Sequence, residues 1–201
     1  MPVYIAFEGA EACGKSSHAK RLAEHLDAVV TRETGGTAIG RRLREILHDT
    51  GVTDLDDHAE TLIVAADRAQ HLAEVVRPAL ASGRHVVSDR SVYSTLAYQG
   101  YGRGLPLDQV RAINEWAVGE TLPDLVILLT VPPEVTERRM AKRERDRFEL
   151  AGDDFHTRVE DGFAAMAAAD PDRWVVLDAS GPVGDVTDAI RGAVRERLGV
   201  G

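Results

Sequence analysis

The stretch Phe7–Lys20, which reads FEGAEACGKSSHAK, decides how the rest of the chain is interpreted. It contains the spacing Gly-x-x-x-x-Gly-Lys-Ser, from Gly9 to Ser16, after an apolar run and before an amphipathic one. In such a loop the glycines let backbone N–H groups surround a phosphate, the lysine reaches the β- and γ-phosphate oxygens, and the serine hydroxyl takes a magnesium site. The motif therefore predicts a nucleoside triphosphate site between a strand and a helix.

We expect the triphosphate to lie along this phosphate loop, residues 9–17, with Lys15 as a catalytic cation and Ser16 as a magnesium ligand. One loop residue is unusual, because Glu11 places a carboxylate in a loop that holds a polyanion. The residues expected to contact the triphosphate are Gly9, Ala10, Glu11, Ala12, Cys13, Gly14, Lys15, Ser16 and Ser17.

Five short apolar runs alternate with longer amphipathic ones along the chain. The apolar runs are VYIAFEG (3–9), AVVTRE (28–33), HVVSDR (85–90), DLVILLTV (124–131) and WVVLDA (174–179). They are apolar on both faces, as buried parallel strands are. Helical patterns cover residues 15–26, 39–48, 57–81, 107–118, 134–144, 155–169 and 185–198. This alternation predicts an α/β fold: a three-layer sandwich of the P-loop NTPase type, with a five-stranded parallel sheet and helices on both faces.

The chain has the length and composition of one domain. Its 201 residues contain no repeat and no linker-like stretch, so we expect a single domain over residues 1–201. Within the helical pattern 57–81, Pro78 predicts a kink or an end near Val76.

The net charge and the cysteine content limit the possible binding partners and the possible cellular compartment of the protein. The net charge of −9 disfavours nucleic acid or an anionic membrane as the main partner. Cys13 is the only cysteine, which excludes an intramolecular disulfide and fits a reducing compartment. The N-terminal stretch MPVYIAFEG lacks the basic flank and the apolar stretch of a signal peptide, and no run approaches the roughly 20 apolar residues of a membrane span. We therefore expect a soluble cytoplasmic protein.

Charged residues gather where the predicted strands end. In parallel sheets, ligands bind beyond the carboxyl ends of the strands. The run HVVSDR ends in Asp89 and Arg90, of which the first is a candidate magnesium ligand and the second can hold a phosphate. The alternative is a surface ion pair. Arg32, Arg44 and Arg68 lie near other strand or helix ends and together suggest a second anion pocket, although each alone could be a solvated arginine.

The densest basic stretch, RRMAKRERDR, runs from Arg138 to Arg147 and holds five arginines and one lysine. Mutual repulsion makes such a cluster costly unless anions neutralise it, although salt reduces that cost. Transfer of a phosphoryl group needs cations around its spread charge, so the stretch predicts a basic lid at about residues 143–152. The alternative is an exposed helix face with i,i+4 pairs to Glu137 and Glu144.

A regulatory GTPase is disfavoured by the remaining motifs. Such a protein needs an Asn-Lys-x-Asp guanine-reading motif, but the only asparagine is Asn114, in NEWA. The one Asp-x-x-Gly match, at Asp178, follows the last predicted strand rather than an early one.

At this point the sequence resembles the thymidylate kinases, P-loop enzymes that phosphorylate dTMP. Five segments match in order over most of the chain: FEGAEACGKSS (7–17), TRETGGTAIGRRLR (31–44), LIVAADRAQH (62–71), VVSDRSVYSTLAYQG (86–100) and DRFE (146–149). The resemblance implies a sheet of five parallel strands, ATP as the donor, Mg²⁺, dTMP as the acceptor, and a homodimer.

The resemblance also implies a role for the loop carboxylate. In this family the acid at the position of Glu11 faces the acceptor and hydrogen-bonds the sugar 3′-hydroxyl. It can also pair with a neighbouring arginine, so its charge need not oppose the triphosphate. The alternative is a solvent-facing loop residue.

On the acceptor side, the resemblance implies that arginines hold the dTMP phosphate and that Asp89 assists magnesium or transfer. Polar side chains would read the thymine edge and touch the ribose, and Tyr98 would crowd out a 2′-hydroxyl. The implied substrate-binding residues are Glu11, Arg32, Arg44, Val64, Arg68, Arg90, Thr95, Tyr98 and Gln99.

Family members whose phosphate loop lacks an arginine, the bacterial type, supply one from the lid. This loop has none, so the resemblance implies Arg147, then Arg143, as catalytic arginines beside Lys15, Asp89 and Arg90.

Three positions depart from the family pattern, all on the acceptor side. Val64 stands where the family usually has a phenylalanine that stacks on thymine, a contact worth about 0.5–1.5 kcal/mol beyond area burial. Ser91 replaces the usual tyrosine or histidine, and Thr34 replaces a proline. Because a cis peptide bond is unfavourable before residues other than proline, we expect the bond between Glu33 and Thr34 to be trans.

The leading interpretation is ATP-dependent phosphorylation of dTMP. One alternative is a related kinase for another pyrimidine nucleotide, such as dUMP, or for a nucleoside. The other is a nucleotide-binding regulator that has lost transfer, against which Lys15, Asp89 and Arg147 argue.

Overall fold

A five-stranded parallel sheet forms the middle layer of the fold. The structure, a computed structural model, describes residues 1–141 and 146–201. The strands are β1 Tyr4–Glu8, β2 Val29–Arg32, β3 Val86–Asp89, β4 Leu125–Thr130 and β5 Trp174–Asp178, in the spatial order β2-β3-β1-β4-β5. Each neighbouring pair is parallel. The predicted sheet is therefore confirmed.

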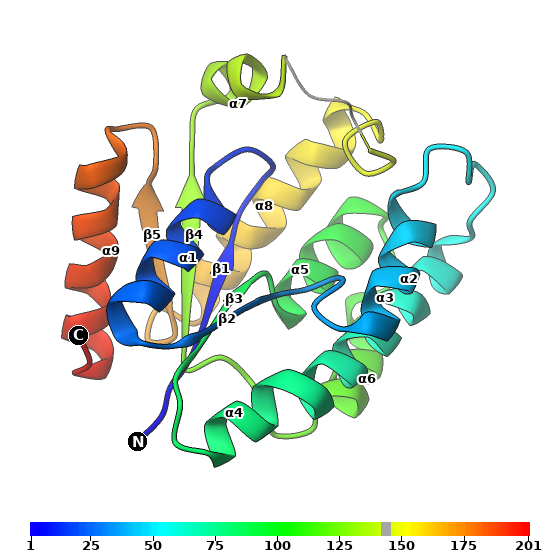
Figure 1. Ribbon diagram of the computed structural model, residues 1–201. Helices are drawn as coiled ribbons and strands as arrows, with labels where there is room; N and C mark the ends of the chain where they lie inside the picture. Colours follow the sequence, from blue (N-terminus) through cyan, green and yellow to red (C-terminus); the bar gives the residue numbers. More distant parts are fainter. Residues whose placement is uncertain (142–145) are drawn as a thin grey trace.

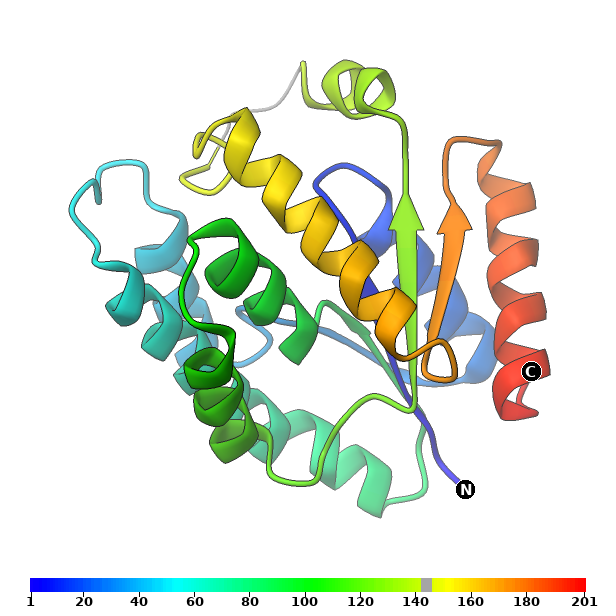
Figure 2. The ribbon, with the colours of Figure 1, turned by 180° about the vertical axis from the view of Figure 1, so that it is seen from behind.

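Helices cover both faces of this sheet, as Figures 1 and 2 show. They are α1 Lys15–Leu26, α2 Ala38–His48, α3 Asp57–His71, α4 Arg77–Ala81, α5 Val92–Thr95, α6 Leu107–Val118, α7 Pro133–Met140, α8 Asp153–Ala169 and α9 Val183–Leu198, with π-helical turns η1 Leu72–Val76 and η2 Leu96–Gly102. In the described part of the chain, none of these helices is both long and apolar enough to cross a membrane.

The alternation of side chains along β1 explains the three layers. Ile5 and Phe7 pack in a core cluster with residues of α1 and α9. Tyr4 packs in a second cluster on the opposite face, with Leu72 and Val76 of η1. Both faces of the strand are buried, so it is apolar at nearly every position.

The helical pattern expected over residues 57–81 is interrupted. α3 ends at His71, the π-helical turn η1 follows, and α4 begins at Arg77, directly before Pro78. The break expected near Val76 is therefore present. Proline lacks a backbone N–H and suits the first turn of a helix.

Residues 92–102 were not expected to be helical, but they form α5 and η2. The first turn is short and β-branched, and its N-cap is Ser91, whose hydroxyl oxygen accepts from the backbone N–H of Tyr93. The helix expected at 134–144 ends at Met140 in α7, and residues 142–145 lie outside the described part of the chain.

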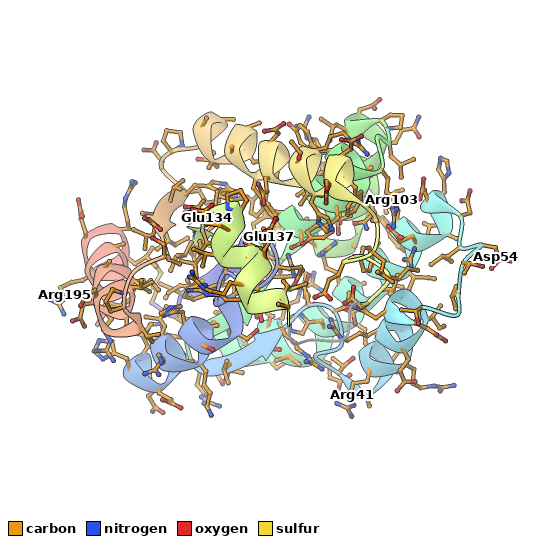
Figure 3. The ribbon with its side chains drawn as sticks, turned by 90° about the horizontal axis from the view of Figure 1, so that it is seen from above. Arg41, Asp54, Arg103, Glu134, Glu137 and Arg195 are labelled. Carbon is orange, nitrogen blue, oxygen red and sulfur yellow. The ribbon has the colours of Figure 1, made fainter. Side chains whose placement is uncertain are left out.

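Strand order and register bring the predicted chemistry to one edge of the sheet. Phe7 of β1 and Arg32 of β2 both pair with Asp89 of β3. The phosphate loop after β1 therefore lies beside Asp89 and Arg90. Figure 3 looks onto this edge and shows α7, with Glu134 and Glu137, crossing it.

Candidate active site

A cavity of about 490 Å³ opens at the carboxyl edge of the sheet. It is bounded by the phosphate loop, α2, α3, α5, η2 and the segment around Phe148. Of the residues predicted from the sequence, it is lined by Glu11, Ala12, Gly14, Lys15, Ser16, Ser17, Arg32, Arg44, Val64, Arg68, Asp89, Arg90, Thr95, Tyr98 and Gln99. Expected donor and acceptor residues thus share one cavity. Gly9, Ala10 and Cys13 belong to the loop but do not line the cavity.

The glycines of the phosphate loop are required by its geometry. Gly9 has φ 139°, and a Cβ there would lie 2.3 Å from the carbonyl oxygen of Leu129. Gly14, with φ 99°, is the N-cap of α1. The first-turn amides of a helix have no intrahelical acceptor, and they offer N–H groups to an anion.

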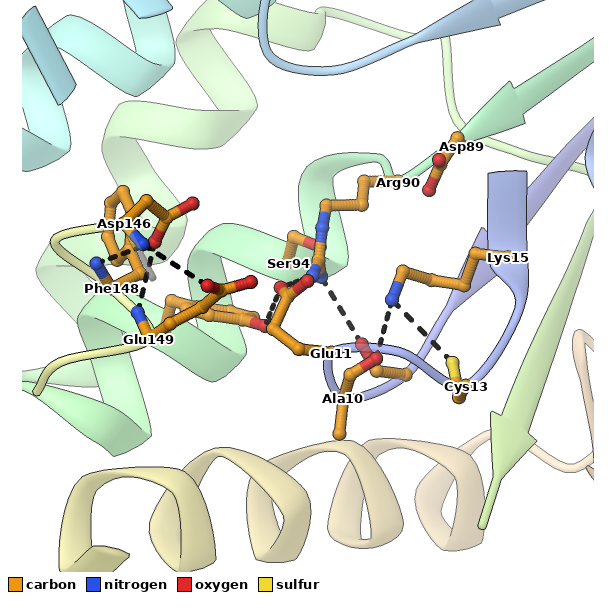
Figure 4. A network of polar contacts seen from close by, with 12 residues as sticks. Ala10, Glu11, Cys13, Lys15, Asp89, Arg90, Ser94, Asp146, Phe148 and Glu149 are labelled. Atoms are coloured by element: carbon orange, nitrogen blue, oxygen red, sulfur yellow. Dashed lines mark hydrogen bonds and ion pairs between the residues drawn. The ribbon is translucent and has the colours of Figure 1, made fainter. Parts of the chain in front are cut away.

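Lys15 follows directly, and its side chain folds back over the loop, as Figure 4 shows. Its Nζ donates to the carbonyl oxygen of Ala10 at 2.6 Å and lies 3.6 Å from Sγ of Cys13. Lys15 as a whole is only 6% exposed, so its ammonium is held next to the place where phosphates would enter.

The predicted magnesium ligands lie in contact. The Ser16 hydroxyl donates to the Asp89 carboxylate. Magnesium prefers oxygen ligands and commonly keeps one or two protein oxygens alongside phosphates and waters. In the described residues no cluster of three or more His, Cys, Asp or Glu forms a cage for a metal ion. This two-residue oxygen site therefore fits Mg²⁺ bound together with a nucleotide.

Glu11 is not aimed at the loop amides but forms an ion pair with Arg90 (Figure 4). Arg90 has φ 73°, and its guanidinium also donates to Oη of Tyr98 at 2.9 Å and Oγ of Ser94 at 3.2 Å. Tyr98 donates its hydroxyl to Glu11 at 3.0 Å. Burial opposes ionisation of Glu11, but Arg90 and Lys15 outweigh it and hold its pKa at about 2. The loop carboxylate is thus an anion paired with Arg90.

A second carboxylate, Glu8 at the end of β1, is completely buried. It accepts from the backbone N–H and the hydroxyl of Ser91, at 2.8 and 2.7 Å, and from the hydroxyl of Ser94 at 2.6 Å. Burial raises its pKa. Ser91, one of the three departures from the family pattern, therefore ties the loop after β3 to the end of β1.

Arg68 is the centre of a buried polar network. It donates to Glu33 at 2.8 Å, Thr95 at 2.8 Å, Asn114 at 2.5 Å and the Ser91 carbonyl oxygen at 3.0 Å. Burial opposes ionisation of Glu33, but Arg68 lowers its pKa. The network fixes the guanidinium at the cavity wall.

Arg32 and Arg44 also line the cavity. Arg44 donates to the carbonyl and hydroxyl oxygens of Thr34, both at 3.3 Å. Burial and the charge of Arg32 lower the pKa of Arg44. Two cations with an unfavourable mutual interaction are suited to an anion between them. The expectation of a trans bond between Glu33 and Thr34 is wrong: the bond is cis.

Arg147, the first lid candidate, does not line the cavity. Arg147 donates to Glu60 at 2.5 Å and to the Leu47 carbonyl oxygen at 2.9 Å. It lines a separate cavity of about 330 Å³. Arg143, the second catalytic candidate, lies outside the described residues.

Arg139 and His48 line the cavity but were not singled out from the sequence. Arg139 of α7 donates to the carbonyl oxygens of Ala12, at 3.0 Å, and Ala179, at 3.3 Å. Nδ1 of His48, at the end of α2, lies 2.6 Å from Oδ2 of Asp146. Arg139 belongs to the basic stretch that the sequence did identify, whereas nothing in the pattern around His48 marked it.

Comparison with known proteins agrees with this geometry. The thymidylate kinase family model matches residues 7–190. A thymidylate kinase of Bifidobacterium longum (strain NCC 2705) is 43% identical, over 96% of this chain and 98% of that protein. One of Desulforudis audaxviator (strain MP104C) is 44% identical, over 98% and 91%. The crystal structure of thymidylate kinase from Ehrlichia chaffeensis has a TM-score of 0.79 at 27% identity and covers 96% of this chain and 98% of its own. The chain belongs to the thymidylate kinase family.

Proposed function

We propose that this chain transfers the γ-phosphoryl group of ATP to dTMP and releases dTDP and ADP. The observation that carries the proposal is the shared cavity, which is lined both by Lys15 with the phosphate loop and by Arg32, Arg44 and Arg90. A donor triphosphate and an acceptor monophosphate can thus be gripped separately and brought together. Family membership favours dTMP as the acceptor.

Transfer on this site needs positioning and charge neutralisation rather than a covalent intermediate. Lys15 and the loop amides would hold the β- and γ-phosphates, and Arg90 would hold the acceptor phosphate in line with them. Ser16 and Asp89 would hold Mg²⁺, which would neutralise phosphate charge when bound. No side chain has to form a bond to phosphorus.

The test of the proposal is ADP release with saturating ATP and a panel of acceptors: dTMP, dUMP, dCMP, CMP and thymidine. We expect the highest kcat/KM for dTMP. If dUMP, CMP or thymidine is clearly faster, the alternative of a related kinase holds. If every acceptor is inert while ATP still binds, the chain is a nucleotide binder.

We expect Glu11→Gln to weaken the binding of acceptor nucleotides that carry a 3′-hydroxyl. A carboxylate that accepts a hydrogen bond contributes about 1.5–3 kcal/mol, so KM for dTMP should rise at least about tenfold. KM for 3′-deoxy-dTMP should change much less, because that analogue lacks the hydroxyl. Steady-state kinetics with both acceptors makes the comparison, and equal losses would contradict the assigned contact.

The lowered pKa of Glu11 predicts a pH dependence of stability. Its folded pKa of about 2 lies below the usual 4.5, so the fold favours the ionised form. The stabilisation is complete above the unfolded pKa and is lost as pH falls from about 4.5 to about 2. We expect the free energy of unfolding to fall more steeply over that range in the wild type than in Glu11→Gln. Parallel urea titrations check this, and identical slopes would contradict it.

We propose that lid arginines complete the site during transfer, in the bacterial manner, with Arg143 and Arg147 as candidates and Arg139 on the donor side. To reach the phosphates, Arg147 would have to give up its ion pair with Glu60. The loss of that ion pair offsets part of the transition-state stabilisation that Arg147 would supply. Arg147→Ala should lower kcat about tenfold with little change in KM for dTMP. An unchanged kcat would leave Arg147 as a structural partner of Glu60.

We also propose a homodimer formed through α2, α3 and α6. Large exposed apolar side chains lie on these helices: Ile39 and Ile46, Leu62, and Trp116, which is 88% exposed. α3 packs against both α2 and α6, so these side chains belong to neighbouring helices. Exposed apolar patches mark interaction sites. Sedimentation velocity should show a dimer for the wild type and a monomer for Leu62→Glu, and a monomeric wild type would contradict the proposal.

We place the protein in the cytoplasm as one catalytic domain over residues 1–201. The buried free thiol of Cys13 fits a reducing compartment. Cell fractionation that finds the protein outside the cytoplasm would contradict the first statement, and an active proteolytic fragment would contradict the second.

A further inference from the structure

Glu60 of α3 is a buried carboxylate that contacts Gln99, a residue of the cavity wall, and the phosphate sites do not explain it. Its side chain is completely buried. It accepts from the amide Nε2 of Gln99 at 2.8 Å, from Arg103 at 3.2 and 3.0 Å, and from Arg147 at 2.5 Å. Burial opposes its ionisation, but the hydrogen bonds from Arg103 and Gln99 lower its pKa. Glu60 is therefore an ionised acceptor at neutral pH.

An ionised carboxylate fixes the orientation of any amide that it contacts. It has no proton to donate, so Gln99 must point its NH₂ group at Glu60. The amide carbonyl then occupies the other position. Gln99 lines the cavity, and within residues 1–141 and 146–201 no donor contacts its carbonyl oxygen. That oxygen is left as an acceptor for a ligand.

The neighbours of Gln99 extend this pattern along the wall. Thr95 lies one turn earlier, on the same face, and accepts from Arg68. A guanidinium has five N–H groups, and four of those of Arg68 are used by Glu33, Thr95, Asn114 and the Ser91 carbonyl oxygen. One donor of Arg68 remains. The wall thus offers a guanidinium N–H and, beside it, a fixed carbonyl oxygen.

This donor and acceptor pair matches only some pyrimidines. Thymine and uracil carry a carbonyl oxygen at C4 next to an N–H at N3, whereas cytosine carries an amino group next to an unprotonated N3. A fixed carbonyl facing the unprotonated N3 would be left unsatisfied in a buried site.

We propose that Glu60 is a positioning residue that locks the Gln99 amide, so that its carbonyl accepts from N3–H of thymine and the site rejects cytosine. The inference rests on the proposed function, since it concerns how the acceptor base is selected. Glu60 itself does not touch the nucleotide.

Glu60→Gln tests whether Glu60 fixes the orientation of the Gln99 amide. A glutamine at position 60 has the same shape but can both donate and accept a hydrogen bond, so it allows the Gln99 amide to rotate by 180°. The measurement is the ratio of kcat/KM for dTMP to kcat/KM for dCMP, with ATP saturating. The ratio should fall about tenfold or more, since a buried unsatisfied group costs about 1–3 kcal/mol. Asp57→Asn is the matched control: it removes a carboxylate 3.4 Å from Arg103 without touching Gln99, and its ratio should match the wild type.

Gln99→Met provides the second variant, and it keeps the inference testable if Glu60→Gln does not fold. This substitution removes the side-chain carbonyl of Gln99, so the ratio of kcat/KM for dTMP to that for dCMP should also fall about tenfold or more. Adding Glu60→Gln to Gln99→Met should not lower the ratio further. A wild-type ratio in folded Glu60→Gln or in Gln99→Met would overturn the inference, as would a wild-type enzyme that uses dCMP as well as dTMP. A wild-type enzyme inert toward dTMP would instead overturn the proposed function.

Discussion

Replacing Lys15 by methionine is expected to lower kcat by about 10²–10³-fold, the loss seen when one preorganised charge or donor is removed from a transition state. Lys15 is the only lysine that lines the cavity in the described part of the chain. Its ammonium is already held by the Ala10 carbonyl oxygen, so it needs little reorganisation as charge spreads on the moving phosphoryl group. Methionine keeps the length of the side chain and removes the charge. Steady-state and single-turnover rates at saturating ATP and dTMP measure the loss.

KM for dTMP should change little in this variant, because Lys15 faces the donor. Lys20→Met is the matched control: Lys20 lies in α1 but is exposed, so kcat should stay within about twofold of the wild type. A Lys15→Met enzyme that retains most of its kcat would remove Lys15 from the transfer step.

Replacing Arg68 by methionine is expected to lower the free energy of unfolding by about 3–5 kcal/mol, the usual cost of breaking a buried ion pair from one side. The substitution would leave Glu33 ionised and buried without its main partner, since the two side chains are each only 2% exposed. Thr95 and Asn114 would lose a donor as well. Urea denaturation at pH 7 measures the change.

Two comparisons isolate the ion pair from a general effect of losing an arginine. Arg41→Met, at an exposed position on α2, should cost no more than about 0.5 kcal/mol. Adding Glu33→Gln to Arg68→Met should recover part of the loss, because the unpaired charge is then gone. A loss below about 1 kcal/mol for Arg68→Met would show that the network does not hold the cavity wall.

The sheet was predictable because its three central strands, β3, β1 and β4, are buried on both faces. A run such as Leu125–Thr130 is apolar at almost every position, which leaves little ambiguity in a chain of alternating patterns. Residues 92–102 were missed because Val92, Ser94 and Thr95 read as extended or loop sequence. Packing of η2 against α8 decides their helical state, and that contact is not visible in the local pattern.

The gathering of the phosphate loop and the strand-end charges around one cavity was predictable from motif spacing and from the charges at strand ends. The buried carboxylates were not, because each depends on partners far away in sequence: Ser91 and Ser94 for Glu8, and Arg103 and Arg147 for Glu60. In sequence alone, such charges look like solvated surface residues. The position of Arg147 outside the cavity was likewise not predictable, because it depends on Leu47 and Glu60, which are far away in sequence.

The central claim is that two separately held phosphates meet in one cavity. A crystal structure with a non-hydrolysable ATP analogue, Mg²⁺ and dTMP tests it most directly. We expect the terminal phosphates of the analogue on the loop amides and Lys15, and the dTMP phosphate on Arg90 with Arg32 and Arg44, facing the γ-phosphate. A dTMP phosphate bound elsewhere, with those arginines contacting neither ligand, would contradict the account.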